Sequence, residues 1–335
     1  MGVRVLAASD KFKGTVSAAD VCAAIGHACW DLGLDCVELP LADGGEGTLE
    51  ILGGTNMHTW VTGPLGDPVL AHWRFSRDVA VIEMARASGL TLVGGATKND
   101  ALAASTQGTG ELIDSALDLG ARKIIVCLGG SATTDGGYGA LRAISAPARL
   151  KAVEFIVACD VETPFLEAAR VFAPQKGATP AQVALLSGRL ERLADTYRSE
   201  YGVDVTGLAG AGAAGGLAGG LAALGAKLMP GFDVVAEETN FDEAIESCDV
   251  VVTGEGRLDD TSFAGKVVGE VAAWGHSLGK PVHAIVGSVD PAIDPAYLEQ
   301  LATSDLSATF TREMSMREPL RCIEDAAREA LRRYC

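Results

Sequence analysis

Short apolar runs recur along the chain, and most of them end at a segment rich in glycine and charged residues. The runs that predict buried strands near the two ends of the chain are Val3–Ala8, Val37–Leu41, Val250–Thr253 and Val282–Val286. Between the first two lies Ala18–Leu32, which has apolar residues at helical spacing and Ser17 in front of it as a candidate N-cap. Strands that alternate with helices pair in parallel, so both ends of the chain are predicted to share one parallel sheet.

The middle of the chain has a different pattern. Short segments with turns between them, Trp60–Gly66, Val69–Phe75 and Val79–Met84, predict antiparallel strands. Two further predicted strands, Lys123–Leu128 and Val153–Cys159, alternate with helical segments. A chain of 335 residues is long for a single hydrophobic core, so two domains are expected. The pattern predicts an α/β protein with two α/β domains. A Rossmann- or flavodoxin-like parallel-sheet domain is formed by residues 1–58 and 239–335, and a mixed-sheet domain, residues 59–238, is inserted into it.

The composition and net charge restrict which binding partners and which cellular compartment are expected. The formal net charge of −17 argues against nucleic acid and anionic membranes as partners, although a local cluster of cations can still bind phosphate. The eight cysteines form no C-x-x-C pair, which favours unpaired thiols in a reducing cytosol. We see no signal peptide and no apolar stretch long enough for a membrane span, so a cytoplasmic protein is predicted. The sequence leaves the oligomeric state open, a homodimer included.

Four glycine-rich blocks carry most of the candidate chemistry. They are Ala42–Thr48, Gly129–Gly137, Gly210–Gly216 and Thr253–Arg257. Glycine lets the backbone turn sharply and approach a ligand, and a helix that starts after such a turn offers free N–H groups to an anion. Carboxylates beside these loops suit a metal ion that accompanies phosphate. Together the blocks predict a site for a phosphorylated ligand.

The candidates in the first domain follow its predicted strands, because ligands bind at the carboxyl ends of strands in open α/β sheets. These residues are Asp10 and Lys13 after the first strand, Asp43, Gly44 and Gly45 after the second, and Gly254 and Glu255 after Val250–Thr253. Asp43 is open to three interpretations: a base, a metal ligand, or a helix N-cap with Glu46 at the third helical position.

The candidates in the middle domain follow its strands in the same way. Gly129, Gly130, Ser131 and Asp135 offer backbone, hydroxyl and carboxylate groups to phosphate, although the block lacks the G-K-[ST] of a Walker A loop. Asp160 ends the strand Val153–Cys159, and Lys176 is an isolated cation shortly after it.

Two other kinds of site are disfavoured. Gly210-x-Gly212-x-x-Gly215 matches the dinucleotide fingerprint in spacing, but it follows no convincing strand, so close helix packing or a phosphate contact is the better interpretation. The five histidines have no ligand spacing, which argues against zinc.

Taken in order, the blocks resemble the bacterial type I glycerate kinases. They are S-D-K-F-K-G-T, L-A-D-G-G-E-G-T, E-M-A-R-A-S-G-L, S-T-Q-G-T-G-E-L-I, G-G-S-A-T-T-D-G-G, A-C-D-V-E-T-P, F-A-P-Q-K-G-A, G-A-G-A-A-G-G and T-G-E-G-R-L-D. The resemblance runs from about Val3 to Lys280. It implies ATP-dependent phosphorylation of D-glycerate, dependence on Mg²⁺, and 2-phosphoglycerate as the product, with 3-phosphoglycerate as the alternative.

The chain departs from this family in three places. Ser9 stands where family members usually have proline. The segment Tyr138–Ile156 is shorter than the resemblance implies, and Phe165–Arg170 lacks the usual glycine turn. Both shortened segments lie in the predicted inserted domain. We predict that residues of the natural protein are missing there; the alternative is a genuine deletion that still permits folding.

The resemblance implies roles for the candidate residues. Asp43 is the first choice for the base or the metal-organising carboxylate, with Asp10 and Asp160 as competitors; Lys13 and Lys176 would hold the substrate carboxylate or the transferring phosphate. Gly129, Gly130, Ser131 and Asp135 would handle the nucleotide phosphates or Mg²⁺. The other residues assigned to the cofactor site are Gly44, Gly45, Gly254 and Glu255. We expect Asp10, Asp43, Asp160 and Lys176 to converge on one cleft between the domains. The rival functions are a non-catalytic binder of a small anionic metabolite and a nucleotide-dependent oxidoreductase using Gly210–Gly215.

Overall fold

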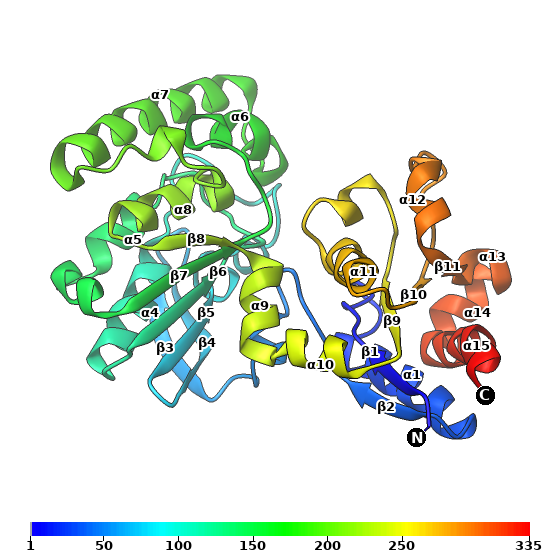
Figure 1. Ribbon diagram of the computed structural model, residues 1–335. Coiled ribbons are helices and arrows are strands. Elements are labelled where there is room, and N and C mark those ends of the chain that lie inside the picture. Colours follow the sequence, from blue (N-terminus) through cyan, green and yellow to red (C-terminus); the bar gives the residue numbers. More distant parts are fainter. Residues whose placement is uncertain (1) are drawn as a thin grey trace. The chain divides into compact units, whose positions relative to one another are not determined.

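The computed structural model describes residues 2–335, and the chain forms two compact units (Figure 1). The first unit comprises Met1–Asp43 and Phe232–Cys335, and the second comprises Gly44–Gly231. The predicted domain boundaries, after residues 58 and 238, differ from these. The short helix α2 (Thr48–Ile51) belongs to the second unit because Gly47 and Leu49 donate hydrogen bonds to Glu83.

The first unit is built on a five-stranded sheet in which every pair is parallel. Its strands are β1 (Arg4–Ala7), β2 (Asp35–Glu38), β9 (Val250–Glu255), β10 (Val282–Val286) and β11 (Ala302–Asp305), in the spatial order β11-β10-β9-β1-β2. Both ends of the chain thus share one sheet, as predicted. Numbered within the unit, this is the flavodoxin-like order, which confirms the predicted fold class.

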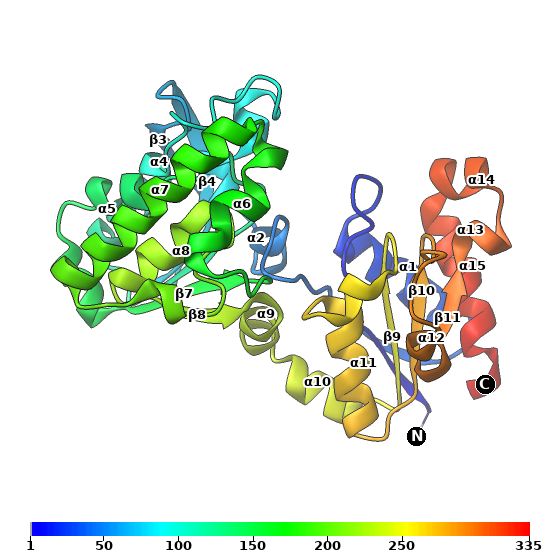
Figure 2. The ribbon, with the colours of Figure 1, turned by 90° about the horizontal axis from the view of Figure 1, so that it is seen from above.

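Helices cover both faces of this sheet (Figure 2). Helix α1 (Ala18–Asp31), capped by Ser17 as predicted, packs with α15 (Pro319–Leu331) against Val5, Val250 and their neighbours. Helix α11 (Val267–Ser277) contributes to a second cluster on β10. The remaining helices are α9 (Gly231–Thr239), α10 (Phe241–Ser247), α12 (Pro295–Gln300), α13 (Leu306–Thr309) and α14 (Arg312–Arg317).

The second unit is built on a six-stranded mixed sheet. Its strands, in spatial and chain order, are β3 (Met57–Thr62), β4 (Pro68–Ser76), β5 (Val79–Glu83), β6 (Lys123–Cys127), β7 (Glu154–Cys159) and β8 (Lys227–Pro230). The pairs β3–β4 and β4–β5 are antiparallel and the other three are parallel, so the predicted antiparallel region ends at β5, whose other neighbour is parallel.

Helices of the second unit gather on one face of its sheet. Because β5, β6, β7 and β8 follow one another in order, right-handed crossovers carry α4 (Gln107–Asp118), α5 (Tyr138–Ala143) and α8 (Ala213–Ala223) to the same side. A further layer, α6 (Ala168–Phe172) and α7 (Pro180–Thr196), packs on these helices around Phe165 and Tyr197 (Figure 1). Helix α3 (Ala85–Ser88) follows β5.

Both shortened segments have regular local structure. Between α5 and β7 the chain forms a 3-10 helix, Pro147–Ala152, and Glu154 then donates its N–H to Arg122 O at 2.8 Å. Phe165–Glu167 is a 3-10 helix that leads directly into α6. No helix within residues 2–335 is both long and apolar enough to cross a membrane.

Candidate active site

The sheet of the first unit has its topological switch point between β1 and β9. From β1 the chain proceeds to β2 on one side, and from β9 it proceeds to β10 on the other. Ligands of flavodoxin-like sheets bind outside the carboxyl ends of the two strands at this point. The residues there are Ser9 and Asp10 after β1, and Gly254 and Glu255 at the end of β9.

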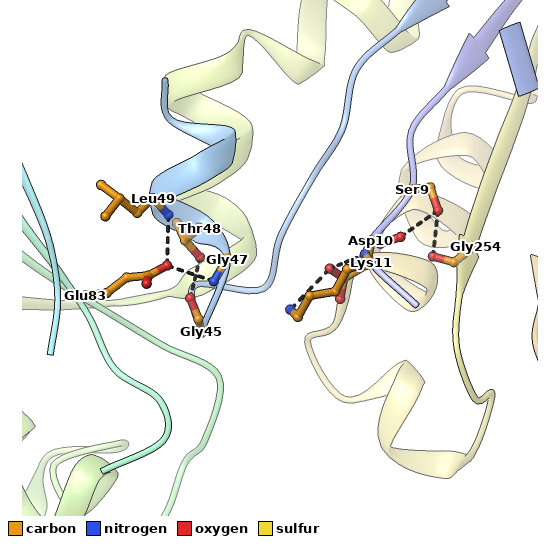
Figure 3. A network of polar contacts seen from close by, with 9 residues as sticks. All are labelled: Ser9, Asp10, Lys11, Gly45, Gly47, Thr48, Leu49, Glu83 and Gly254. Carbon is orange, nitrogen blue, oxygen red and sulfur yellow. Dashed lines mark hydrogen bonds and ion pairs between the residues drawn. The ribbon is translucent and has the colours of Figure 1, made fainter. Parts of the chain in front are cut away.

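The two chain segments at the switch point are held together by short hydrogen bonds (Figure 3). Asp10 donates its N–H to Gly254 O at 3.0 Å, and the buried Ser9 Oγ lies 2.9 Å from both Gly254 O and Asp10 O. A Cβ on Gly254 would lie 2.3 Å from Ile285 O, so this position needs glycine for packing. Ser9, which departs from the family pattern, therefore fixes the backbone that carries Asp10.

Asp10 is a carboxylate held in a poorly solvated place. Its Oδ1 accepts a hydrogen bond from Lys11 N at 2.7 Å and lies 3.5 Å from Lys11 Nζ (Figure 3). Burial raises the pKa of Asp10 to about 6, against the opposing effect of Lys11 and with a further contribution from the charge of Asp43. Asp10 and Asp43 are therefore close enough to interact, as expected for residues after neighbouring strands.

Glu255 is the second carboxyl group of the switch point. Its Oε1 is buried without a hydrogen-bond partner. Burial raises the pKa of Glu255 to about 7, although Ser262 and Lys266 favour the ionised form, and the charge of Asp10 adds to the increase. Two carboxyl groups with raised pKa values beside a switch point are typical of a functional site.

Asp43 and Lys13 complete the candidates of this unit. The segment after β2 stays paired with the segment after β1, because Leu41 donates its N–H to Ser9 O at 3.0 Å, and the half-buried Asp43 follows two residues later. Lys13 is exposed on the turn between Phe12 and Val16. No group of three or more acidic, histidine or cysteine side chains within residues 2–335 is arranged to hold a metal by itself. One or two carboxylates with substrate phosphates suffice for Mg²⁺.

Replacing Glu255 by glutamine should stabilise the protein above pH 7. Because the folded-state pKa, about 7, lies above the ordinary value of 4.5, ionisation costs stability as the pH rises through this range. The variant should match the wild type near pH 4 and exceed its free energy of unfolding by about 1–3 kcal/mol at pH 8. Urea denaturation at several pH values measures the difference.

Asp259→Asn is the control with the opposite sign. Hydrogen bonds from Thr261 lower the pKa of Asp259, so its charge stabilises the folded state at neutral pH and this contribution is lost in acid. If the difference in free energy of unfolding between Glu255→Gln and the wild type were the same at pH 4 and at pH 8, the raised pKa of Glu255 would be contradicted.

In the second unit, the parallel strands β5, β6 and β7 also end at one edge. They lead to Glu83, to Gly129 and Gly130, and to Asp160, which is exposed. Glu83 had no role assigned from the sequence and appeared only within the E-M-A-R block. A carboxylate at the end of a buried strand was the signal that could have identified it.

Glu83 is the buried anchor of the glycine loop that precedes α2 (Figure 3). Its Oε1 accepts hydrogen bonds from Gly47 N at 2.7 Å and Leu49 N at 3.0 Å, and its Oε2 accepts one from Arg86 Nε at 3.0 Å. Its side chain is 2% exposed. The carboxylate thus takes the place of an N-cap side chain for α2.

The prediction that Asp43 and Glu46 cap this helix is wrong. Helix α2 begins at Thr48 with Gly47 at the N-cap position, where φ is 98° and no side chain caps. Gly44 is required for another reason: its φ is 83°, and a Cβ there would lie 2.4 Å from the Cα of Gly231. Asp43 is therefore not the N-cap of α2.

The loop after β6 packs against the loop before α2. A Cβ on Gly129 would lie 3.3 Å from both Glu46 N and the Cα of Gly45, so these glycines, predicted to contact the cofactor, are brought together. Gly130, with φ at 61°, accepts a hydrogen bond from Leu90 N. The N–H groups of Gly129 and Gly130 donate to no other group in the described part of the chain, and they remain available to an anion.

Asp135 serves the fold. Its carboxylate accepts hydrogen bonds from Thr106 N and Thr106 Oγ1 at 2.8 Å, from Gly137 N at 3.1 Å and from Gly139 N at 3.2 Å. Four donors occupy the oxygens that were predicted to contact phosphate. This geometry favours an anchoring role for Asp135 between the starts of α4 and α5.

Lys176 is also buried. It is 3% exposed, and its Nζ donates to Thr133 O at 2.6 Å. Asn99, which the sequence gave no reason to select, donates to Ala132 O and to Lys176 O at 2.9 Å each. Asn99 and Lys176 therefore hold the backbone of the loop Gly129–Thr134 in place at Ala132 and Thr133. The convergence of Lys176 and Asp160 with Asp10 and Asp43 stays a prediction.

The block Gly210–Gly216 is a packing element. The residues before it form a 3-10 helix, Val205–Gly207, and the block leads directly into α8. A Cβ on Gly212 or Gly215 would lie 2.4 Å from Pro164 O or 2.0 Å from Thr133 O. The strand that a dinucleotide fingerprint requires does not precede it, so the structure favours close packing over NAD binding.

Two of the cavities in the described part of the chain lie away from the switch point. The larger, about 720 Å³, is lined by residues at the amino ends of β1, β2 and β9, including Arg4, Asp35 and Asp249. This is the edge opposite to the switch point, so its size does not make it the substrate site. The smaller, about 290 Å³, is lined by Tyr138, Arg189, Arg192 and their neighbours in the second unit.

Comparisons with known proteins agree on one family. The sequence profile of the glycerate kinase family matches residues 5–148 and 145–335. These two stretches meet between α5 and β7, where the chain is shorter than the resemblance implies. Glycerate 2-kinase of Escherichia coli (strain K12) is 41% identical over an aligned length of 327, and the match covers 86% of this chain and 86% of that protein.

Two further proteins extend the comparison. Glycerate kinase of Bacillus subtilis (strain 168) is 38% identical over an aligned length of 335, and the match covers 88% of this chain and 87% of that protein. A crystal structure from Salmonella typhimurium LT2, of a protein provisionally named glycerate kinase 2, is 35% identical with a TM-score of 0.83. The match covers 98% of this chain and 97% of that chain, so it spans both units.

Proposed function

The chain belongs to the glycerate kinase family, and on that premise we propose that it transfers the terminal phosphoryl group of ATP to D-glycerate and releases 2-phosphoglycerate. It is an enzyme, a glycerate kinase. The observation that carries the proposal is the pair Asp10 and Glu255, two carboxyl groups with raised pKa values at the switch point of the first unit.

The reaction needs a proton acceptor, charge neutralisation and positioning. We assign the acceptor to Asp43, with Asp10 and Asp160 as the alternatives. A carboxylate oxygen of this residue would take the proton of the glycerate hydroxyl as the hydroxyl oxygen bonds to the γ-phosphorus of ATP. The bond from that phosphorus to the β,γ-bridging oxygen breaks, and ADP leaves. The exposed ammonium of Lys13 is suited to the carboxylate of glycerate, because its stem is flexible and its charge has no ion-pair partner among the described residues.

The phosphate groups of ATP are assigned to the glycine loops of the second unit. Gly129 and Gly130 have unused N–H groups, and the glycines at positions 44 and 45 let the backbone approach closely. Bound Mg²⁺ would neutralise phosphate charge, and the carboxylate oxygens of Asp43 and Asp10 have the hard oxygen chemistry that it prefers.

The test is product identification with ATP, Mg²⁺ and D-glycerate. We expect ADP to form in proportion to glycerate consumed, and the product to be converted by enolase without phosphoglycerate mutase, since enolase acts on 2-phosphoglycerate. Conversion only when the mutase is added would identify 3-phosphoglycerate instead. Tight glycerate binding without ADP formation would support the non-catalytic alternative and contradict the proposal.

A further inference from the structure

Lys176 is a buried cation without a counter-ion. Its side chain is 3% exposed, and its Nζ donates to one backbone carbonyl, Thr133 O, at 2.6 Å. No carboxylate lies within ion-pair distance of this nitrogen in residues 2–335, whereas Lys11 has the carboxylate of Asp10 at 3.5 Å. Burying an ammonium group without an opposite charge is costly, so the isolated group tends to lose its proton.

The surroundings of Lys176 are polar and incompletely satisfied. Thr133 and Thr134 are almost fully buried, at 0% and 1% exposure, and neither hydroxyl has a hydrogen-bond partner. Oδ1 of Asn99 also lacks a partner, although its amide nitrogen ties Ala132 O to Lys176 O. The loop Gly129–Thr134 and its lysine thus hold hydrogen-bonding capacity that the protein alone does not use.

Asp135 acts electrostatically on the amine of Lys176, but its effect is smaller than that of burial. Asp135, at the end of the same loop, is the carboxylate that favours the charged lysine, and its oxygens are occupied by Thr106, Gly137 and Gly139. Lys98 and Asp100 flank Asn99 in the sequence but make no contribution. The segment around Gly215 carries no titratable group. Burial therefore dominates and lowers the pKa of Lys176 to about 7.

We propose that binding of the ATP phosphates at the loop Gly129–Thr134 is coupled to uptake of one proton by the amine of Lys176. The inference rests on the proposed function, because it takes this loop to be the phosphate site. The proton comes from solvent and bonds to the lone pair of Nζ, so that a neutral amine becomes the ammonium that offsets the phosphate charge.

The coupling follows from electrostatics in a poorly solvated place. Negative charge on the loop stabilises the protonated amine, whose Nζ donates to Thr133 O of the same loop. Linkage makes the effect reciprocal, so protonation of Lys176 strengthens phosphate binding. Below pH 7 the amine is already charged and no uptake is needed. Above pH 7 the dissociation constant of the nucleotide should increase about tenfold per pH unit, as one linked proton requires.

Calorimetry with a non-hydrolysable ATP analogue and Mg²⁺ measures this uptake. Titrations at pH 8 in two buffers with different ionisation enthalpies should give about one proton taken up per nucleotide by the wild-type protein. Lys176→Arg keeps a permanent cation and should bind with uptake near zero and an affinity independent of pH. Lys176→Met should also show no uptake, with weaker binding.

The possible results distinguish failure of the proton coupling from failure of the proposed function. Nucleotide binding without proton uptake, or uptake that survives in Lys176→Arg, overturns the inference and leaves the proposed function standing. Absence of nucleotide binding contradicts the proposed function itself. If neither variant folds, the wild-type protein still decides: an affinity that stays constant from pH 7 to pH 9 overturns the coupling.

Discussion

Asp43→Asn should lower kcat by about two to four orders of magnitude while the protein remains folded. Asparagine has nearly the same shape, but its amide does not accept the hydroxyl proton of glycerate. Asp43 follows the edge strand β2, and its charge acts on Asp10 within the first unit. The capping role that would have explained the residue structurally is taken by Gly47 and Glu83. Steady-state kinetics and thermal unfolding of the same preparation measure both effects.

Asp35→Asn is the matched control, because Asp35 is an exposed carboxylate at the opposite end of the same strand. Its activity should remain within about twofold of the wild type, as for surface substitutions away from special features. Near-normal turnover of Asp43→Asn would remove Asp43 from the mechanism. A large loss in Asp10→Asn would then move the assignment to that residue, whose pKa of about 6 predicts a pH–rate profile rising through this value.

The parallel sheet of the first unit and its candidate residues were predictable because their signals are local. A strand such as Val250–Glu255 is buried along most of its length and begins with three valines, and Gly254 near its end is required by close packing against Ile285 O. Once both ends of the chain are placed in one parallel sheet, Asp10 and Glu255 must lie at one edge. Their raised pKa values were not predictable, because burial depends on packing from distant segments.

Other parts of the fold left weak signals in the sequence. Strand β8 has four residues and ends in proline, and the edge strand β11, Ala-Thr-Ser-Asp, is mostly polar, so neither shows the pattern of a strand. The sequence identified Lys176 only as an isolated cation. In the structure it is buried, its Nζ donates to Thr133 O, and Asn99 donates to its backbone oxygen. Such roles depend on tertiary contacts between residues far apart in sequence, which spacing does not encode.

An aspartate in a glycine-rich block can either bind a ligand or stabilise the fold, and the hydrogen bonds of Asp135 favour the second role. Its position in a block of glycines and hydroxyl residues predicted contact with phosphate, because anion sites have that composition. In the structure the same glycines let the chain curl around the carboxylate, so that Gly137 N and Gly139 N donate to it. The neighbouring Gly129 and Gly130 keep their N–H groups unused, and they are the better candidates for the ligand.

Glu83→Ala should destabilise the second unit by about 3–5 kcal/mol. The carboxylate is 2% exposed and accepts hydrogen bonds from Gly47, Leu49 and Arg86. Alanine leaves two N–H groups without acceptors and one guanidinium without its buried partner. Amide hydrogen exchange at Gly47 and Leu49 should accelerate together with the loss of stability. Because a protein with two units need not unfold in one step, exchange at these amides is the more direct measurement.

Glu50→Ala provides the control, since Glu50 contacts the same guanidinium at 2.8 Å but is 53% exposed. An exposed pair contributes about 0–1 kcal/mol, so this variant should unfold almost as the wild type does. Glu83→Gln should fall between the two, because its amide oxygen still accepts from the loop while the charge facing Arg86 is gone. Equal effects of Glu83→Ala and Glu50→Ala would mean that the buried carboxylate does not hold the glycine loop. The ordering of Gly44–Gly47 would then have to come from the glycine packing against Gly129 and Gly231 alone.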